Sequence, residues 1–474
     1  MSMNEKLLTA QNVIGLPFYE VDRLQECVDV YERNWHKNRI KNRYYEGKIR
    51  LGEVNLGIAL PKSFGGLEIG CSWGAKTVDV LAARSMFDGF VAEDGSEMTE
   101  MVEIMKANNL IAEYDKTCRD ELKLGCSFAT LSKDDDIGCK IRFHSSQTAA
   151  AVWDGSLNRI AYGFAIIDTK QRSDSDFGWV ATIINFYTEN AIYVLRRDDN
   201  DIWRAEIHPH PLGRPMMVPF VWNPTSQKPF GQGRLKEPIR NLINGYVRTI
   251  ANATIGLEFA TSPQKYLLGV TDDQYDAVIN QKFRQYIGNI LASTNNPETG
   301  EKPTFGQLQQ GNLQPHVEMI RLLATQFSAA TGLSVTDTGI INDANPTSSD
   351  AILAQSQTLI ALAEQLNTGN GDALRQVALM ALAIANDTTL DGLSDEQKSV
   401  IPHFKNPAMP SVAATADAAV KIASVRPGFA QTDVFLEMMG YDQADIRRIK
   451  AQEQRQRGLN TLMEIANESE SEAV

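Results

Sequence analysis

The pattern of apolar and polar positions divides the chain into a helical, a β-rich and a second helical part. In the first part, apolar residues recur every three or four positions, which is the period of an amphipathic helix. Leu24, Val28 and Tyr31 share one such face, and Gly47 is typical of a helix end. The helices predicted here cover residues 21–48, 73–86 and 97–123.

Short β-rich runs then replace the helical period. Clusters of Asp, Asn, Ser and Gly separate them, as expected for turns. Seven runs of this kind predict an antiparallel sheet or sandwich. They cover residues 126–131, 140–144, 150–153, 160–168, 180–188, 191–196 and 203–208.

The cluster Asp198-Asp199-Asn200-Asp201 lies between the last two runs and has two interpretations. Its carboxylates resemble part of a calcium-binding loop, but the glycine and the terminal glutamate of such a loop are missing at the proper spacing. A solvated hairpin turn is therefore the preferred interpretation.

The tripeptide Gly231-Gln232-Gly233 follows a proline-rich stretch without regular period, residues 211–229. It invites interpretation as a phosphate-binding loop. However, the third glycine of a dinucleotide-binding motif is absent, no clear parallel strand precedes it, and no Gly-Lys-Ser/Thr follows. We interpret the tripeptide as the opening of a helix.

Two helices flank a compositionally different insert. The first is predicted over residues 234–260, with Pro238 acceptable only in its first turn. The second, residues 317–330, again places its apolar residues on one face. The insert between them is expected to contain a strand at residues 266–268 and a short helix at residues 275–284.

A capped helix is predicted after the next loop. Thr347 is a possible N-cap, and Asp350 stands three residues later. The side chain of each residue can then accept a hydrogen bond from the free backbone amide of the other residue. The helix is expected over residues 351–366, and Asn370-Gly371 is expected to separate it from another at residues 372–386.

The charge balance narrows the possible partners. Forty-six Lys and Arg against 59 Asp and Glu leave a formal net charge of −13 in 474 residues. Such an acidic chain argues against a large surface that grips nucleic acid phosphates. Beyond residue 391 we expect two or three small helices and then a frayed acidic end, residues 464–474.

The composition is that of a folded globular chain with two to four lobes. Its longest strongly apolar run, residues 377–385, is too short to cross a bilayer. The N-terminus lacks the pattern of a signal peptide. We therefore expect a soluble intracellular product with no membrane partner.

Candidate metal and catalytic residues are sparse. The five cysteines include no Cys-x-x-Cys pair and are interpreted as reduced structural thiols, with a zinc site that includes His144 as the alternative. His208 and His210 flank a proline, which favours a turn over a metal site. There is no nucleophile elbow, His-Glu-x-x-His or Walker motif. We predict no catalytic residue, no metal and no cofactor.

Four segments, in this order, give the chain a resemblance to a known family. They are Tyr44-Tyr45-Glu46-Gly47; Gly231-Gln232-Gly233-Arg234 continuing to Glu258-Phe259 and Ser262-Pro263-Gln264-Lys265-Tyr266-Leu267-Leu268-Gly269; Asn345-Pro346-Thr347-Ser348-Ser349-Asp350-Ala351-Ile352; and Pro410-Ser411 with Asp417-Ala418 and Lys421. With these segments spread over nearly its whole length, the sequence resembles the portal proteins of tailed bacteriophages.

The resemblance implies an α+β, portal-like fold. It would contain a helical and antiparallel-β wing, a two-helix stem, a small α/β clip, a tunnel loop with its helix, and a helical crown. The implied boundaries are 1–233 for the wing, 234–260 and 317–332 for the stem helices, 261–316 for the clip, 333–347 for the tunnel loop, 348–400 for the tunnel helix and return to the wing, and 401–474 for the crown with its acidic tail.

The function implied by the resemblance is not enzymatic. Portal proteins form a ring, usually of twelve copies, at one vertex of the viral capsid in the virion. Double-stranded DNA passes through this ring non-specifically during packaging and ejection. The implied partners are further copies of the chain, the major capsid protein, the terminase large subunit and a head-completion adaptor.

The resemblance also assigns roles to particular residues. It places Asp337, Ile340, Asn342, Asp343 and Asn345 in the tunnel loop beside the DNA. Thr347 and Asp350 would cap the tunnel helix. The stem would carry Arg240, Arg248 and Arg321, and the clip would offer Asn295, Asn296 and Glu298 for docking.

Charge in the predicted tunnel segment fits passage of DNA better than grip. Residues 333–386 contain five acids and a single base, Arg375; the acids are Asp337, Asp343, Asp350, Glu364 and Asp372. A duplex that must slide cannot be held by many phosphate ion pairs. A basic ring could come only from outside the segment, for instance from Arg240 or Arg321. The alternative is that these acids simply solvate a surface helix.

A competing hypothesis is an acidic soluble enzyme or scaffold, monomeric or dimeric, with a central all-β domain and no nucleic-acid role. Sizing of the purified protein distinguishes the two hypotheses, because only a portal protein is expected to form a large ring.

Overall fold

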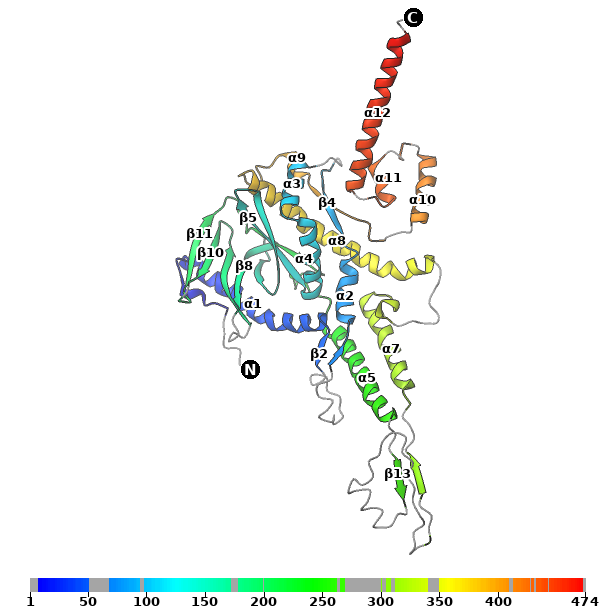
Figure 1. The fold of residues 1–474 in the computed structure, drawn as a ribbon. Helices are drawn as coiled ribbons and strands as arrows, with labels where there is room; N and C mark the ends of the chain where they lie inside the picture. Colours follow the sequence, from blue (N-terminus) through cyan, green and yellow to red (C-terminus); the bar gives the residue numbers. More distant parts are fainter. Residues whose placement is uncertain are drawn as a thin grey trace.

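The computed structural model describes residues 7–50, 68–93, 98–171, 178–198, 200–261, 265–268, 300, 304–307, 312–339, 349–408, 412–426, 428–429, 432–441 and 443–471. In these residues, helices and mainly antiparallel sheets form a body with two helical projections on opposite sides (Figure 1). The predicted α+β class is confirmed.

Four helices make up most of the N-terminal part. They are α1 (Phe18–Tyr45), α2 (Trp73–Ala82), α3 (Thr99–Ala107) and α4 (Leu110–Leu124), preceded by the 3-10 turn η1 (Ala10–Asn12). The single helix predicted over residues 97–123 is wrong. Asn109 has a left-handed φ of 50°, and the buried Asn108 side chain donates to the Cys139 carbonyl and accepts from the Ile141 amide. Short amide side chains favour such local breaks.

All seven predicted strands form, but they divide between two sheets. The larger has six strands in the order β1-β11-β10-β9-β8-β7, antiparallel except for the β1–β11 pair. They are β1 (Val13–Ile14), β7 (Ala149–Asp154), β8 (Arg159–Gln171), β9 (Trp179–Tyr187), β10 (Ala191–Arg197) and β11 (Trp203–Pro209). The acidic cluster lies in the β10–β11 hairpin turn, as predicted, where Asp198 accepts from the amides of Asn200 and Ile202.

The second sheet has the order β12-β5-β6 and includes a strand that the pattern did not predict. Its strands are β5 (Cys126–Asp134), β6 (Gly138–Ser145) and β12 (Met217–Val221). Pro219 made the β12 segment resemble irregular chain. Because β12 lies at the edge of the sheet, a proline there removes no essential ladder hydrogen bond.

Two short pairs of strands complete the body. They are β2 (Lys48–Arg50) with β3 (Glu68–Gly70), and β4 (Phe87–Val91) with β15 (Ile401–Phe404). The second pair joins segments more than 300 residues apart in the sequence. It therefore ties the C-terminal part of the chain back to the N-terminal helices.

The two long helices that flank the insert lie side by side outside the body (Figure 1). They are α5 (Glu237–Thr261) and α7 (Gln314–Thr331). Pro238 lies in the first turn of α5, as predicted. Beyond the pair, β13 (Lys265–Leu268) and β14 (Thr304–Gln307) form an antiparallel two-stranded sheet, which confirms the predicted strand. The helix predicted at residues 275–284 lies outside the described residues.

The break predicted at Asn370-Gly371 is wrong, because α8 (Ser349–Ala385) is one continuous helix of 37 residues. Asn370 is fully buried, and its amide donates to the Tyr114 hydroxyl and the Glu121 carboxyl group. A Cβ at Gly371 would stand 3.7 Å from the Phe404 ring. Burial and hydrogen bonding here offset the cost of about 1 kcal/mol for a glycine in a helix.

The C-terminal part is helical. It contains α9 (Asp395–Lys398), α10 (Val412–Val425), α11 (Asp433–Met438) and α12 (Gln443–Ser471). The expected fraying from residue 464 is wrong for the backbone, because α12 continues to Ser471. Its sequence contains no proline and is rich in good helix formers such as Ala, Arg, Gln and Glu.

Two hydrophobic cores hold these elements. The smaller lies between α1 and the six-stranded sheet, where Leu24, Val28 and Tyr31 pack with Phe164 and Phe186. The larger runs through α2, α4 and the three-stranded sheet to α5, α7 and α8. The α5–α7 pair is therefore rooted in the larger core.

Candidate functional site

The α5–α7 pair is fixed to the body by the side chain of Trp73 at the start of α2. Its ring lies 4.4 Å from that of Tyr246 on α5 and 4.7 Å from that of Phe327 on α7, centroid to centroid. The indole Nε1–H donates to the Thr338 carbonyl at 3.2 Å, just beyond α7. One buried residue therefore contacts both helices and the turn that follows them.

Arg234 makes a second link at the same junction. Its guanidinium donates from Nε to the Thr77 carbonyl on α2 at 2.7 Å and from Nη2 to the Thr331 carbonyl at the end of α7. It also lies over the Trp222 ring, 5.8 Å from the centroid. Burial lowers the pKa of Arg234 to about 10, so the side chain remains a cation at neutral pH.

The glycines before Arg234 permit close contact between backbones rather than phosphate binding. A Cβ at Gly231 would stand 2.1 Å from the Trp222 carbonyl oxygen, and one at Gly233 would stand 2.3 Å from that of Lys123. The amides of Gly231 and Gln232 already donate to the carbonyls of Lys228 and Trp222. This agrees with the interpretation of the tripeptide as a structural opening to the helix.

The Tyr44-Tyr45-Glu46-Gly47 segment joins the end of α1 to the same junction. The Tyr44 hydroxyl donates to Asn244 Oδ1 on α5 at 2.8 Å. The Tyr45 hydroxyl donates to Asp79 Oδ1 on α2 at 2.9 Å. Gly47 has a φ of +68°, which suits glycine, and a Cβ there would stand 2.9 Å from the Cys71 carbonyl.

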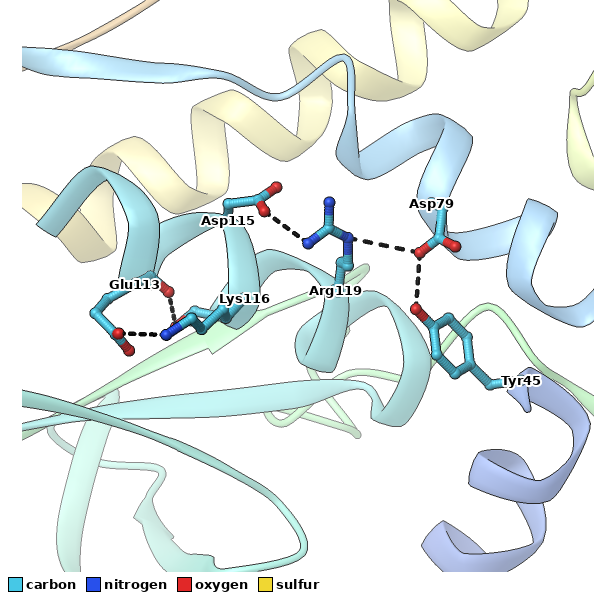
Figure 2. A network of polar contacts seen from close by, with 7 residues as sticks. Tyr45, Asp79, Glu113, Asp115, Lys116 and Arg119 are labelled. Atoms are coloured by element: carbon cyan, nitrogen blue, oxygen red, sulfur yellow. Dashed lines mark hydrogen bonds and ion pairs between the residues drawn. The ribbon is translucent and has the colours of Figure 1, made fainter. Parts of the chain in front are cut away.

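A surface network continues from Tyr45 across three helices (Figure 2). Asp79 on α2 lies 3.6 Å from Arg119 Nε on α4, and Arg119 Nη1 lies 2.6 Å from Asp115 one turn earlier. Glu113 and Lys116 form a further pair at 2.6 Å. Exposed pairs of this kind stabilise a protein only modestly. The network therefore contributes little to the free energy of unfolding, and its main effect is on the relative orientation of α1, α2 and α4.

Along their length, α5 and α7 pack through small and apolar residues. Residues at four-residue spacing on α5 are buried: Ile239, Ile243, Val247 and Ala251. A Cβ at Gly245 would stand 3.2 Å from a Leu323 methyl group, so glycine allows close approach of the helices. Other apolar side chains remain exposed: Leu257 (48%) on α5, and Val317 (43%), Met319 (43%) and Leu322 (52%) on α7.

The three arginines predicted on the stem do not share one environment. Arg240 is half-buried at the base of α5, where it donates to the Leu235 carbonyl at 3.1 Å and lies 5.8 Å from the Tyr44 ring centroid. Arg248 and Arg321 are exposed on α5 and α7. A role for any of them beside DNA stays a prediction.

Asp337 closes the turn after α7 and forms part of η4 (Thr336–Thr338). Its Oδ2 accepts hydrogen bonds from the backbone amide and hydroxyl of Ser334, at 3.0 and 2.7 Å. This carboxylate is thus used within its own turn. Ile340, Asn342, Asp343, Asn345 and Thr347 lie outside the described residues, as do Asn295, Asn296 and Glu298. The backbone of Asp350 is described, in the first turn of α8.

The thiol and histidine groups give no sign of a metal site in the described part of the chain. No group of three or more His, Cys, Asp or Glu side chains there could hold a metal ion. The five cysteines are free, and four are buried. His144 lies 3.0 Å from the Thr130 hydroxyl, and burial lowers its pKa to about 4.

One buried polar cluster was missed by sequence reasoning. Glu121 on α4 is fully buried and receives a hydrogen bond from Asn370 on α8, while Tyr114 bonds both Asn370 and Ser85. Burial raises the pKa of Glu121 to about 8, although the Asn370 bond acts in the opposite direction. The one signal in the sequence was that residues 114 and 121 lie seven positions apart, on the same face of a helix as several apolar residues. A polar residue on such a face is expected to be buried.

No helix in the residues that the structure describes is both long and apolar enough to span a bilayer. The chain belongs to the family described as phage portal protein, SPP1 Gp6-like, whose model matches residues 19–458.

Two relatives agree with this assignment. The chain is 25% identical over 434 residues to the portal protein of Mycobacterium phage D29, which covers 89% of this chain and 86% of the relative. It is 25% identical over 413 residues to the portal protein of Mycobacterium phage L5, with 84% and 81% covered. The resemblance stated from the sequence is confirmed, and the alternative of an acidic enzyme or scaffold is set aside.

Two similar solved structures are chains in the necks of GTA particles. One is a chain in the neck of a native GTA particle computed with C12 symmetry, with a TM-score of 0.42, 13% identity, and coverage of 78% of this chain and 89% of that one. Another is in the neck of an empty GTA particle computed with C6 symmetry, with a TM-score of 0.44, 14% identity, and coverage of 81% and 94%.

Proposed function

We propose that copies of this chain form a closed ring, with twelve as the expected number, around a channel for double-stranded DNA. In this ring α5 and α7 form the wall as the stem, and the residues up to 233 form the wing. The ring stands at one capsid vertex and serves DNA packaging and ejection.

The exposed apolar side chains on the projecting pair are the observation that carries the proposal. Met319 and Leu322 lie three residues apart on one face of α7 and are about half exposed. Exposed apolar groups gathered on one element mark contact surfaces. In a ring that closes by rotation, each subunit presents two different complementary faces. These side chains would meet the next subunit's α5.

The channel role rests on two charged residues, Arg321 on α7 and Asp337 in the turn after it. Arg321 on the exposed surface of α7 is a candidate for brief phosphate contacts. Asp337 already accepts hydrogen bonds from Ser334. We therefore assign it a role in stabilising the turn rather than a direct contact with the duplex. A channel lining with few cations allows DNA to slide, because each ion pair with a phosphate must be broken for the duplex to move and so raises the energy barrier to movement.

Docking is assigned to the far end of the pair. The β13–β14 strand pair stands beyond α5 and α7, away from the body (Figure 1). We assign this clip end to the terminase large subunit and the head-completion adaptor, with Asn295, Asn296 and Glu298 as contact residues. The body on the other side would meet the major capsid protein.

A double substitution of Met319→Asp and Leu322→Asp tests ring closure. Both side chains are exposed in the single chain, so the fold should survive while assembly fails, because two carboxylates would be buried in each contact. Analytical ultracentrifugation and negative-stain microscopy of particles made with capsid protein would measure ring formation.

The matched control is Leu459→Asp on α12, where the side chain is 57% exposed. Rings should form with this variant. If the double variant assembles as well as wild type, the stem contact is refuted; if wild-type protein never forms a ring under any packaging condition, the ring itself is refuted.

A further inference from the structure

A recess of 420 Å³ lies beside the C-terminal half of α1, where this helix meets β5, β7 and the loop before α5. Three cationic side chains line it: Lys37 and Lys41 from α1, and Arg240 from α5. The lining also contains neutral side chains with polar groups: Tyr31, Asn34, Asn38 and Ser146. This recess lies apart from the exposed face of α7.

The local charge is opposite to that of the whole chain. Between Glu32 and Glu46, α1 contains five bases and no acid; the bases are Arg33, Lys37, Arg39, Lys41 and Arg43. In a chain with a net charge of −13 such a segment is exceptional. Bases near a helix C-terminus interact favourably with its dipole, but that effect does not require a base from α5 to join them.

Two of the three cations are held in place by neighbouring groups. Lys41 Nζ donates to the Leu124 carbonyl at 2.6 Å, which leaves two of its three protons for another acceptor. Arg240 Nη1 donates to the Leu235 carbonyl, and its guanidinium lies over the Tyr44 ring. Lys37 is exposed at the rim. An acceptor entering the recess would meet cations that are already ordered.

The cations have no acidic counterpart in the recess. None of the described residues that line it is Asp or Glu. Burial lowers the pKa of Lys41 to about 8, the nearby Cys126 opposes this shift, and the charges of Arg240 and Lys37 add to it. Like charges that crowd a partly buried lysine are costly unless an anion neutralises them.

We propose that this recess binds a small phosphate-type oxyanion, held by Lys37, Lys41 and Arg240. Three positive charges that line one recess, with those of Lys37 and Arg240 acting on Lys41, match a multiply charged oxyanion better than a single carboxylate. A DNA duplex is a convex rod, so its backbone would touch the rim without filling the recess. The inference goes beyond the portal function and does not depend on ring formation.

Calorimetric titration of the full chain with inorganic phosphate, at pH 7 and an ionic strength of about 0.15 M, tests the proposal. We expect saturable binding of about one phosphate per chain. Lys37→Glu should weaken binding about tenfold or more, because it places an anion at the rim in place of a charge-assisted donor. Lys37 is exposed, so thermal unfolding should show this variant as folded as wild type.

The matched control is Arg39→Glu, on the same helix and with the same change in charge. Arg39 is exposed, stacks on Trp35 and does not line the recess. Its phosphate affinity should stay within about twofold of wild type, since only long-range electrostatics change. Arg240→Gln, which removes a cation from the other wall, should weaken binding as Lys37→Glu does.

Three results would overturn the proposal. One is the absence of saturable phosphate binding by the wild-type chain. Another is an equal loss of binding in the Lys37 and Arg39 variants. A third is a chain that binds a short blunt duplex but not phosphate, with both variants equally impaired; that would show general attraction to a basic surface.

Discussion

The α5–α7 pair and α12 both project from the body, yet they are built differently (Figure 1). The base of the pair is buried and contacts Trp73 and Arg234, whereas the only residue described as buried on α12 is Ile446. Outside its base, the pair exposes apolar side chains such as Leu322, whereas the described side chains of α12 beyond Ile446 are mostly charged or amide groups, with Leu459 exposed among them.

The two projections therefore differ in how firmly they are attached to the body. A projection rooted through buried rings and buried hydrogen bonds moves together with the body. Among its described side chains, α12 contacts the rest of the chain near its N-terminal end, through the buried Ile446 and the Lys450–Asp433 ion pair at 2.5 Å. Its exposed side chains beyond these residues can therefore be changed with little effect on the rest. Three substitutions test this contrast.

The largest effect is expected from Trp73→Ala. It removes the ring between Tyr246 and Phe327 and leaves a cavity at the base of both helices, so the free energy of unfolding should fall by about 3–5 kcal/mol. Chemical denaturation followed by circular dichroism measures the change. Trp73→Phe should cost less, since it keeps the ring stacking. A loss below about 1 kcal/mol for the alanine variant would show that the base is not anchored by this residue.

Arg234→Met is expected to cost about 2–4 kcal/mol, because the buried carbonyls of Thr77 and Thr331 lose their donor. The matched substitution on the other projection is Arg455→Met on the exposed surface of α12, with an expected change within about 0.5 kcal/mol. Thermal unfolding of both variants makes the comparison directly. Equal effects would remove the distinction between the two projections.

Glu121→Gln tests the buried polar cluster in the body to which the α5–α7 pair is attached. Burial raises the pKa of Glu121 to about 8 from an ordinary value near 4.5. Below the unfolded value both states bind the proton; between the two values only the folded state does, so stability is lost as pH rises toward 8. From pH 5.5 to pH 7.5, wild type should lose about 2–3 kcal/mol relative to Glu121→Gln.

The measurement is the difference in unfolding free energy between the two proteins across that pH range, which cancels the titration of all other groups. A constant difference between wild type and Glu121→Gln would mean that Glu121 keeps its charge in the folded protein.

The matched segments show how far motif reasoning reached. Tyr44-Tyr45-Glu46-Gly47 and Gly231-Gln232-Gly233-Arg234 identified the family, and the structure gives them a shared purpose at the base of the helix pair. Nothing in the sequence indicated that Arg234 would be buried, because its partners are carbonyl groups on elements about 100 or more residues away. The motif residues that resemble a phosphate-binding loop instead make close backbone and hydrogen-bond contacts with neighbouring elements.

Periodicity alone determined most of the elements of this protein. Apolar spacing and turn-forming clusters were enough for α1, α2, α5, α7 and seven strands, since these depend on local preferences. Only the tertiary structure decided that α8 continues through Asn370 and Gly371, that β12 joins a sheet despite Pro219, and that three cations from α1 and α5 line one recess. Each of these depends on burial and hydrogen bonds between distant segments, and such contacts leave no period in the sequence.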